Sequence, residues 1–296
     1  MLVQGVAVIG PGRIGGALAT ALSNNGYSID EIVYRSRGPS KKLLSRLTGD
    51  LHVLRFNKDL RLRSSLIFIT VQDEELPRLV SELVGKVPRG ATIFHTSGSI
   101  SSEILEPFRN DRAKIASMHP LVSVPSWDGP ASGFENIYFC IEGDQPALRT
   151  SKILVKALKA RYFTIRTEQK GLYHASALMA AGHVTALFDI ALGLLMKTGV
   201  KRPVARELLH PLIASVVTNL SVADTDQALT GTYARGDETT IQRHLDSLGS
   251  VATFDEIDVY LQLAGRSIDL AERNGLDSKK VKKMRSIIKM AKRQMQ

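Results

Sequence analysis

The stretch GVAVIGPGRIGGALATAL, residues 5–22, decides the fold of the first half of the chain. An apolar run typical of a buried strand leads into Gly10-Pro11-Gly12-Arg13-Ile14-Gly15, and this motif opens a helical pattern. In such a strand–turn–helix context, G-x-G-x-x-G indicates a dinucleotide site: the glycines allow a tight turn, a close approach to pyrophosphate and close helix–strand packing. We therefore expect all six residues of the motif to bind a dinucleotide at the helix N-terminus.

The rest of the chain falls into two patterns. Strands are expected at 3–9, 32–34, 53–56, 66–71, 91–95, 114–118, 137–141 and 162–165, with helices at 13–24, 74–84 and 145–160. From Glu168 onward the pattern is helical, with helices near 168–198, 203–222, 237–248, 252–273 and 277–296. This alternation predicts an α/β fold: a doubly wound, mostly parallel Rossmann sheet over 1–166, followed by an all-helical domain over 167–296.

Composition places the chain among globular proteins. It has 296 residues, 44% hydrophobic and 23% charged, which excludes a largely disordered chain and leaves room for two domains. The net charge is +10, but seven of these charges lie in residues 277–296. There the apolar residues Val281, Met284 and Ile288 step by three and four. This spacing predicts an amphipathic surface helix with a solvated basic face, rather than a nucleic-acid or membrane contact.

Cysteine and histidine usage argues against disulfides and metals. The single cysteine, Cys140, excludes an intramolecular disulfide and a Cys-rich metal site, and it favours a reducing cytoplasm. His95, His119 and His174 have no short ligand spacing, so we expect no metal.

One apolar stretch, 175–196, is long enough to be mistaken for a membrane span. It contains His183 and Asp189, and a central aspartate costs roughly 2.5–3.5 kcal/mol on insertion scales. We expect a buried helix at a domain or subunit interface instead. No charged segment precedes the glycine motif as a signal peptide would require, so we expect a cytoplasmic protein that does not bind membranes.

The end of the second expected strand distinguishes NAD from NADP. NAD sites carry an acidic residue there, but this chain has Arg35-Ser36-Arg37, while Asp30 and Glu31 come before that strand. A guanidinium and a hydroxyl suit a 2′-phosphate, so we predict NADP as cofactor. Val71 and Thr96, at the ends of two further strands, complete the expected cofactor-binding set.

Polar residues also follow the fifth and sixth expected strands. Because ligands bind beyond the carboxyl ends of strands in open α/β sheets, we expect Ser97 and Ser99 to bind substrate. His119 is a candidate acid or base in catalysis, or a histidine that satisfies loop backbone before a proline. His95 lies within the apolar strand, where a structural role is favoured.

The helical half offers four further candidates. Lys170 and His174 are four residues apart and share one helix face, so either could protonate a substrate oxygen in catalysis. Lys170 could equally be a solvated lysine in the first turn. His183 is a candidate substrate-binding residue or a core histidine, and Arg235, in a glycine-flanked segment, is a candidate carboxylate clamp or a surface residue.

A family resemblance emerges from five segments: GPGRIGGALATAL, FHTSGS, SMHPL, LYHASALMAAGH and ALTGTYARGDETTIQRHL. Together they resemble Rossmann-like NADP oxidoreductases with a helical C-terminal domain. The layout is similar to that of ketopantoate reductases, pyrroline-5-carboxylate reductases and 6-phosphogluconate dehydrogenases. The resemblance implies an NADP-dependent reductase of a small carbonyl acid, dimeric through its helical domain, with ketopantoate as the leading substrate.

Departures from the family pattern leave the substrate open. Ketopantoate reductases carry a lysine and an asparagine on the helix that enters the second domain; here His174 is near the lysine position and His183 takes the asparagine position. Thr232 stands where the family has a proline. Ser97 and His119 also resemble the Ser and His of prephenate and arogenate dehydrogenases. Reduction of an imine such as pyrroline-5-carboxylate is an alternative. An alternative of another class is a non-catalytic NADP-binding sensor, against which the His and Ser residues at the strand ends argue mildly.

Overall fold

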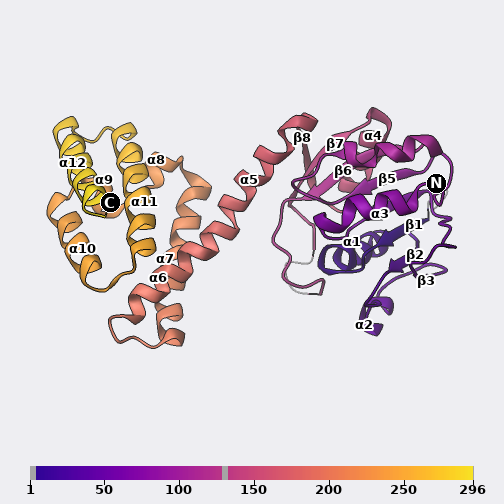
Figure 1. Ribbon diagram of the computed structural model, residues 1–296, viewed down its shortest axis with the longest axis horizontal. Helices are drawn as coiled ribbons and strands as arrows, with labels where there is room; N and C mark the ends of the chain where they lie inside the picture. Colours follow the sequence, from indigo (N-terminus) through magenta and orange to yellow (C-terminus); the bar gives the residue numbers. More distant parts are fainter. Residues whose placement is uncertain (1–4, 129–132, 296) are drawn as a thin grey trace. The chain divides into compact units, whose positions relative to one another are not determined.

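The computed structural model describes residues 5–128 and 133–295, and its contacts divide the chain into two units, 1–182 and 183–296. Strands and helices alternate up to β8, and the chain is helical after it, close to the expected change at residue 167. The first helix after β8, Lys170–Ala180, belongs to the first unit. Figure 1 labels most of the helices and strands.

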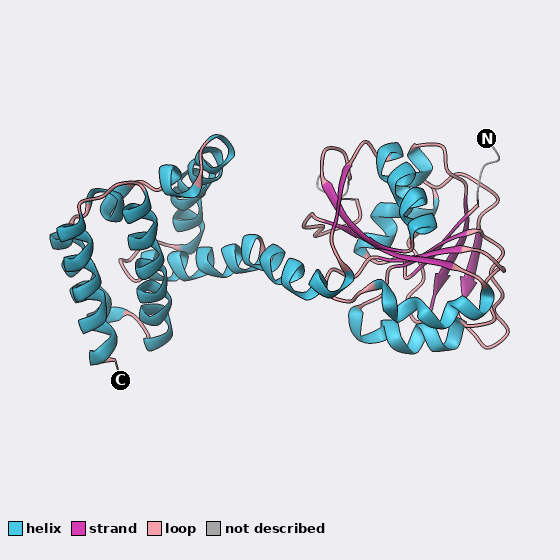
Figure 2. Cartoon of the chain, turned by 90° about the horizontal axis from the view of Figure 1, so that it is seen from above, coloured by secondary structure: helices cyan, strands magenta, loops and turns pink. Residues whose placement is uncertain are grey.

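The first unit is an eight-stranded sheet between two layers of helices (Figure 2). The strand order is β3-β2-β1-β4-β5-β6-β7-β8, parallel throughout except for the antiparallel pair β6–β7. This confirms the predicted doubly wound, mostly parallel fold. The strands are β1 Val6–Ile9, β2 Ile29–Tyr34, β3 His52–Arg55, β4 Leu66–Ile69, β5 Thr92–His95, β6 Lys114–Pro120, β7 Tyr138–Gly143 and β8 Arg161–Thr164.

Apolar side chains on both faces of the sheet hold the helices. Val6 and Val8 of β1 face one core cluster, whereas Ala7 and Ile9 face the other, as the two-residue period of a strand requires. The helices of this unit are α1 Arg13–Asn24, α2 Lys41–Leu44, α3 Leu76–Leu83, α4 Gln145–Ala157 and α5 Lys170–Ala180, with 3-10 turns η1 Asp73–Glu75, η2 Ser102–Asp111 and η4 Thr167–Gln169.

The second unit is entirely helical over its described residues. Its small core joins α10, α11 and α12 through buried residues that include Ile241, Ile268 and Met284. As predicted, the last helix is amphipathic and turns Val281, Met284 and Ile288 inward. The helices are α6 Gly182–Met196, α7 Arg202–Val222, α8 Thr225–Ala228, α9 Gly231–Arg235, α10 Glu238–Val251, α11 Phe254–Arg273 and α12 Ser278–Gln294.

The long apolar helix expected over 168–198 is broken. Ala181 leaves helical geometry (φ −122°, ψ −72°), so α5 and α6 are separate elements. Within the single chain this stretch is not the buried helix that we expected. Lys170 is the only buried residue of α5, and Leu192 is the only buried residue of α6. Among the described residues, 167–196 is the one helical stretch long and apolar enough to cross a membrane.

Candidate functional site

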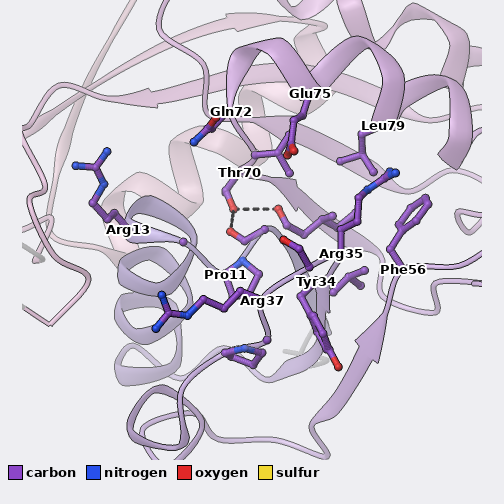
Figure 3. A pocket seen from close by; sticks show the side chains of 18 of the residues that line it. Pro11, Arg13, Tyr34, Arg35, Arg37, Phe56, Thr70, Gln72, Glu75 and Leu79 are labelled. Atoms are coloured by element: carbon purple, nitrogen blue, oxygen red, sulfur yellow. Dashed lines mark hydrogen bonds between the residues drawn. The ribbon is translucent and has the colours of Figure 1, made fainter.

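A cavity of about 610 Å³ opens at the carboxyl ends of β1, β2 and β4 (Figure 3). It lies where the glycine motif predicts a dinucleotide, and its volume is in the range of ligand sites. Eight of the predicted cofactor-binding residues line it: Gly10, Pro11, Gly12, Arg13, Arg35, Ser36, Arg37 and Val71. Ile14, Gly15 and Thr96 do not.

The glycine turn has the geometry that a pyrophosphate needs. Gly10 has a φ of +92°, a left-handed conformation that L-residues with side chains rarely adopt. A Cβ on Gly12 would meet nothing within 4 Å, so the α1 N-terminus is open to a ligand. A Cβ on Gly15 would lie 2.2 Å from the Gly10 carbonyl oxygen. The contribution of Gly15 is therefore close helix–strand packing.

The two arginines after β2 differ in their surroundings. Arg35 forms an ion pair with Glu82, and its guanidinium lies 4.5 Å from the centre of the Phe56 ring. Arg37 is exposed and makes no ion pair with any residue of the described ranges (Figure 3). Glu31 sits early in β2, where its carboxylate accepts hydrogen bonds from Ser64. The guanidinium of Arg37 is therefore an unpaired cation at the cavity, as a 2′-phosphate site requires.

The loop after β6 also reaches this cavity. Trp127 lines it and packs against Gly16 of α1, where an added Cβ would lie 3.0 Å from the Trp127 Cβ. Lys42 of α2 pairs with the neighbouring Asp128. Sequence reasoning missed Trp127, because nothing local links a loop after the sixth strand to the first helix.

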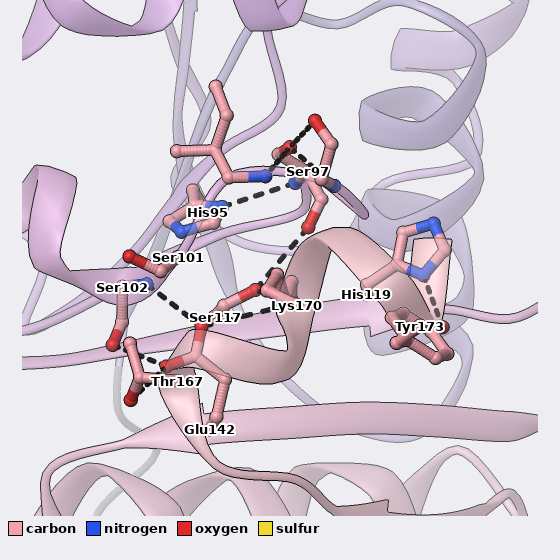
Figure 4. A network of polar contacts seen from close by, with 12 residues as sticks. His95, Ser97, Ser101, Ser102, Ser117, His119, Glu142, Thr167, Lys170 and Tyr173 are labelled. Carbon is pink, nitrogen blue, oxygen red and sulfur yellow. Dashed lines mark hydrogen bonds and ion pairs between the residues drawn. The ribbon is translucent and has the colours of Figure 1, made fainter. Parts of the chain in front are cut away.

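A second cluster gathers around His119 at the end of β6 (Figure 4). The ring of His174, from α5, lies 5.9 Å from that of His119, edge to face. Gly98, in the loop after β5, fits against both: a Cβ there would lie 2.4 Å from His174 Cδ2 and 2.8 Å from His119 Nε2. The structure thus brings together two candidate imidazoles that are 55 residues apart in the chain.

His119 is held as a neutral imidazole. Burial, followed by the positive charges of Lys170 and His174, lowers the pKa of His119 to about 3, and Asp73 opposes this only weakly. Its Nδ1 is 2.6 Å from the hydroxyl of Tyr173, a residue that sequence reasoning did not single out.

Ser97 and Ser99 border this cluster with their hydroxyls already engaged. Ser97 Oγ accepts hydrogen bonds from the backbone N–H groups of Ser99 (3.2 Å) and Ile100 (3.0 Å). Ser99 Oγ donates to Asp73 at 2.5 Å. Both side chains therefore shape the loop that carries Gly98.

Lys170 is not the solvated lysine that its place in a first helical turn would allow. Only 2% of it is exposed, and its Nζ donates to Ser117 Oγ at 2.5 Å (Figure 4). The carboxylate of Glu142 lies 3.8 Å from Nζ and accepts from Ser102 N at 2.8 Å. Burial lowers the pKa of Lys170, and the charge of Lys170 in turn lowers the pKa of His119.

His95, for which the sequence favours a structural role, lies at the end of β5. It is fully buried, and its Nδ1 accepts from Ser97 N at 3.2 Å. Its Nε2 has no hydrogen-bond partner among the described residues. Burial lowers the pKa of His95 to about 3. Within the described ranges no three His, Cys, Asp or Glu residues form a metal site.

His183 and Arg235 belong to the second unit. His183 is exposed on α6. Arg235 ends α9, where its backbone carbonyl accepts from Lys280 Nζ at 3.1 Å, so the expected glycine-flanked loop is a short helix. Asp237 caps α10 by accepting from Thr240 N at 3.0 Å. The structure does not join His183 or Arg235 to the His119 cluster within one unit.

Two family models match different parts of the chain, and the boundary between them falls within the sheet, between β6 and β7. Residues 3–120 match a family of Rossmann-like domains, which sets the class of the first half. Residues 137–267 match a domain of unknown function, DUF2520, so the chain combines a Rossmann-like domain with a DUF2520 domain. A comparison with curated protein sequences finds no match.

Solved structures share this fold at low identity. A candidate NADP oxidoreductase from Bacteroides fragilis is 21% identical, with a TM-score of 0.72 over 91% of this chain and 98% of that one. A protein from Thermotoga maritima is 22% identical, with a TM-score of 0.69 over 91% and 99%. A pyrroline carboxylate reductase from Plasmodium falciparum, solved with NADP bound, is 14% identical, with a TM-score of 0.57 over all of both chains. The fold is therefore one that NADP oxidoreductases use.

Proposed function

We propose that this protein is an NADP-dependent reductase of a small carbonyl acid. The observation that carries the proposal is the pairing of His119 with His174 around Gly98 at the carboxyl edge of the sheet. The dinucleotide cavity opens at this same edge, where ligands of open α/β sheets bind. Solved oxidoreductases with the same fold support the proposal.

The residues of the cavity fit NADP. The open α1 N-terminus at Gly12 and Arg13 would hold the pyrophosphate, and Ser36 with the unpaired Arg37 would hold the 2′-phosphate. Arg35, anchored by Glu82, would form a wall of the cavity. When bound, the nicotinamide supplies a hydride to an electrophilic carbon.

The paired imidazoles would serve the substrate oxygen. One donates a hydrogen bond that polarises the carbonyl, and the other, when protonated, gives its proton to that oxygen. Glycine at residue 98 makes room for both rings, because a side chain there would collide with them. Lys170 is buried close enough to His119 to lower its pKa. The positive charge of Lys170 would also stabilise negative charge on the substrate oxygen.

Oxidation of NADPH by the purified protein tests this proposal. Ketopantoate comes first in the panel, since the sequence motifs resemble ketopantoate reductases, followed by pyrroline-5-carboxylate and simple 2-oxo acids. We expect turnover on one of these, and a fall in kcat of about 10²–10⁴-fold in His119→Ala and in His174→Ala. His52→Ala, at an exposed position on β3, should match the wild type. NADPH binding with no turnover on any substrate would contradict the proposal and favour a sensor.

A further inference from the structure

The hydroxyl of Tyr173 joins two polar groups of the sheet. It lies 2.6 Å from His119 Nδ1 and close enough to the thiol of Cys140 for the two groups to shift each other's pKa. Cys140 on β7 is the register partner of His119 on β6, so one residue of α5 bridges a cross-strand pair. The ring of Tyr173 packs against those of His119 and Phe163, with centroids 5.7 Å apart in each case.

The direction of the hydrogen bond between Tyr173 and His119 follows from the chemistry of the groups involved. Burial raises the pKa of the Cys140 thiol to about 11 and raises the pKa of the Tyr173 phenol further, so both keep their protons at neutral pH. A phenol has one proton to donate, and an imidazole nitrogen accepts it far better than sulfur does. The phenol therefore donates to His119 Nδ1.

This direction leaves Nε2 of His119 as the donor. A neutral imidazole carries one proton, and Nδ1 is occupied as an acceptor, so the proton lies on Nε2. Nε2 is the atom that a Cβ on residue 98 would approach to 2.8 Å. Glycine at this position therefore keeps Nε2–H open to a ligand.

We infer that Tyr173 is a positioning residue, which holds His119 as a neutral imidazole with its proton on Nε2. The inference rests on the proposed reductase function and assigns different roles to its two histidines. His119 donates a hydrogen bond to the substrate oxygen and keeps its proton. His174 gives its own proton to that oxygen as the electron pair of the C=O π bond becomes the new O–H bond. Neutral histidine is known to polarise carbonyls in this way.

The charged groups around His119 agree with this assignment. Lys170 and His174 face it from α5, Asp73 faces it from η1, and Cys140 lies across from it on β7. Burial, Lys170 and His174 all lower the pKa of His119, so the ring is neutral at neutral pH.

Nitrogen NMR of the whole protein tests the tautomer without any substrate. In a two-bond ¹H–¹⁵N correlation spectrum, the signals of His119 are those that disappear in His119→Asn. For this ring we expect a protonated Nε2, an unprotonated Nδ1 and no titration between pH 5 and 8. A proton on Nδ1, or an imidazolium at pH 7, would overturn the inference.

Tyr173→Phe tests the role of the hydroxyl. We expect the Nδ1 resonance of His119 to move as its hydrogen bond is lost, and kcat to fall about tenfold with the KM for NADPH unchanged. Cys140→Ser should retain the Nδ1 resonance, because the phenol still donates to Nδ1, and Tyr138→Phe, at an exposed position of β7, should change nothing. An unmoved Nδ1 resonance in Tyr173→Phe would overturn the inference. Absence of turnover in every variant would overturn only the proposed function.

Discussion

At the scale of single residues, we expect Arg37 to select NADPH over NADH. It is exposed at the cavity and unpaired with any described acid, whereas Arg35 is held by Glu82 and Phe56. A charge-assisted hydrogen bond is worth roughly 1.5–3 kcal/mol, so Arg37→Ala should weaken NADPH binding about 10- to 100-fold. NADH binding should not change, because NADH lacks the 2′-phosphate.

Isothermal titration of both cofactors measures this difference. Arg149→Ala, at an exposed position of α4, is the matched control and should bind as the wild type does. An equal loss of affinity for NADPH and NADH in Arg37→Ala would show that Arg37 supports the cavity without binding the 2′-phosphate.

The buried ring of His95 should make the free energy of unfolding fall as the pH is lowered. Its pKa is about 3 in the folded chain against about 6.5 unfolded, so the unfolded chain binds the proton first as pH falls. This contribution to stability is therefore complete above pH 6.5 and is lost between pH 6.5 and 3. In His95→Gln the free energy of unfolding should fall less steeply over this range, by up to about 1.4 kcal/mol per pH unit.

Urea unfolding at a series of pH values provides the slope. His119 titrates in the same direction and should leave a residual slope in the variant. Identical slopes in wild type and His95→Gln would mean that the buried ring takes up a proton without opposing folding.

At the scale of elements, α12 is a core helix in spite of its charge. Met284 is fully buried against α10 and α11, and Lys282, two residues earlier, is exposed. Truncating a buried methionine costs about 2–5 kcal/mol. Met284→Ala should therefore lower the thermal midpoint by several degrees, while Lys282→Ala stays within about 0.5 kcal/mol of the wild type. Equal midpoints would contradict the packing of this helix.

Strand ends could be predicted from sequence, whereas contacts between distant elements could not. The glycine motif and the placement of His119 follow from local patterns, since parallel strands bring their carboxyl ends to one edge. The contact of Tyr173 with His119 joins residues 54 apart and depends on how α5 docks. The break at Ala181 was missed because alanine favours a helix, and local propensity says nothing against continuing one.

At the scale of the whole molecule, one face of α7 is apolar and exposed. Five large apolar residues recur every fourth position with 47–61% of each exposed: Val204, Leu208, Leu212, Val216 and Leu220. Soluble monomers rarely expose an apolar patch of this extent. We propose that a second copy of the chain covers it, in keeping with the dimer expected from sequence.

Sedimentation equilibrium of the full chain checks the assembly. We expect a dimer for the wild type and a monomer for the double variant Leu208→Glu, Leu212→Glu, because buried unpaired carboxylates oppose association. Arg206→Glu, on the same helix but outside the stripe, should remain dimeric. A monomeric wild type that binds lipid vesicles would instead assign this face to a membrane.

The chain contains a single tryptophan, and it lines the dinucleotide cavity. Trp127 is therefore a built-in optical probe of that one place. Its emission overlaps the absorption of a reduced nicotinamide, so filling the cavity should quench the indole and sensitise the light emitted by the bound coenzyme. Occupancy can thus be followed by fluorescence in the unlabelled protein, in every variant described above, before any substrate is known.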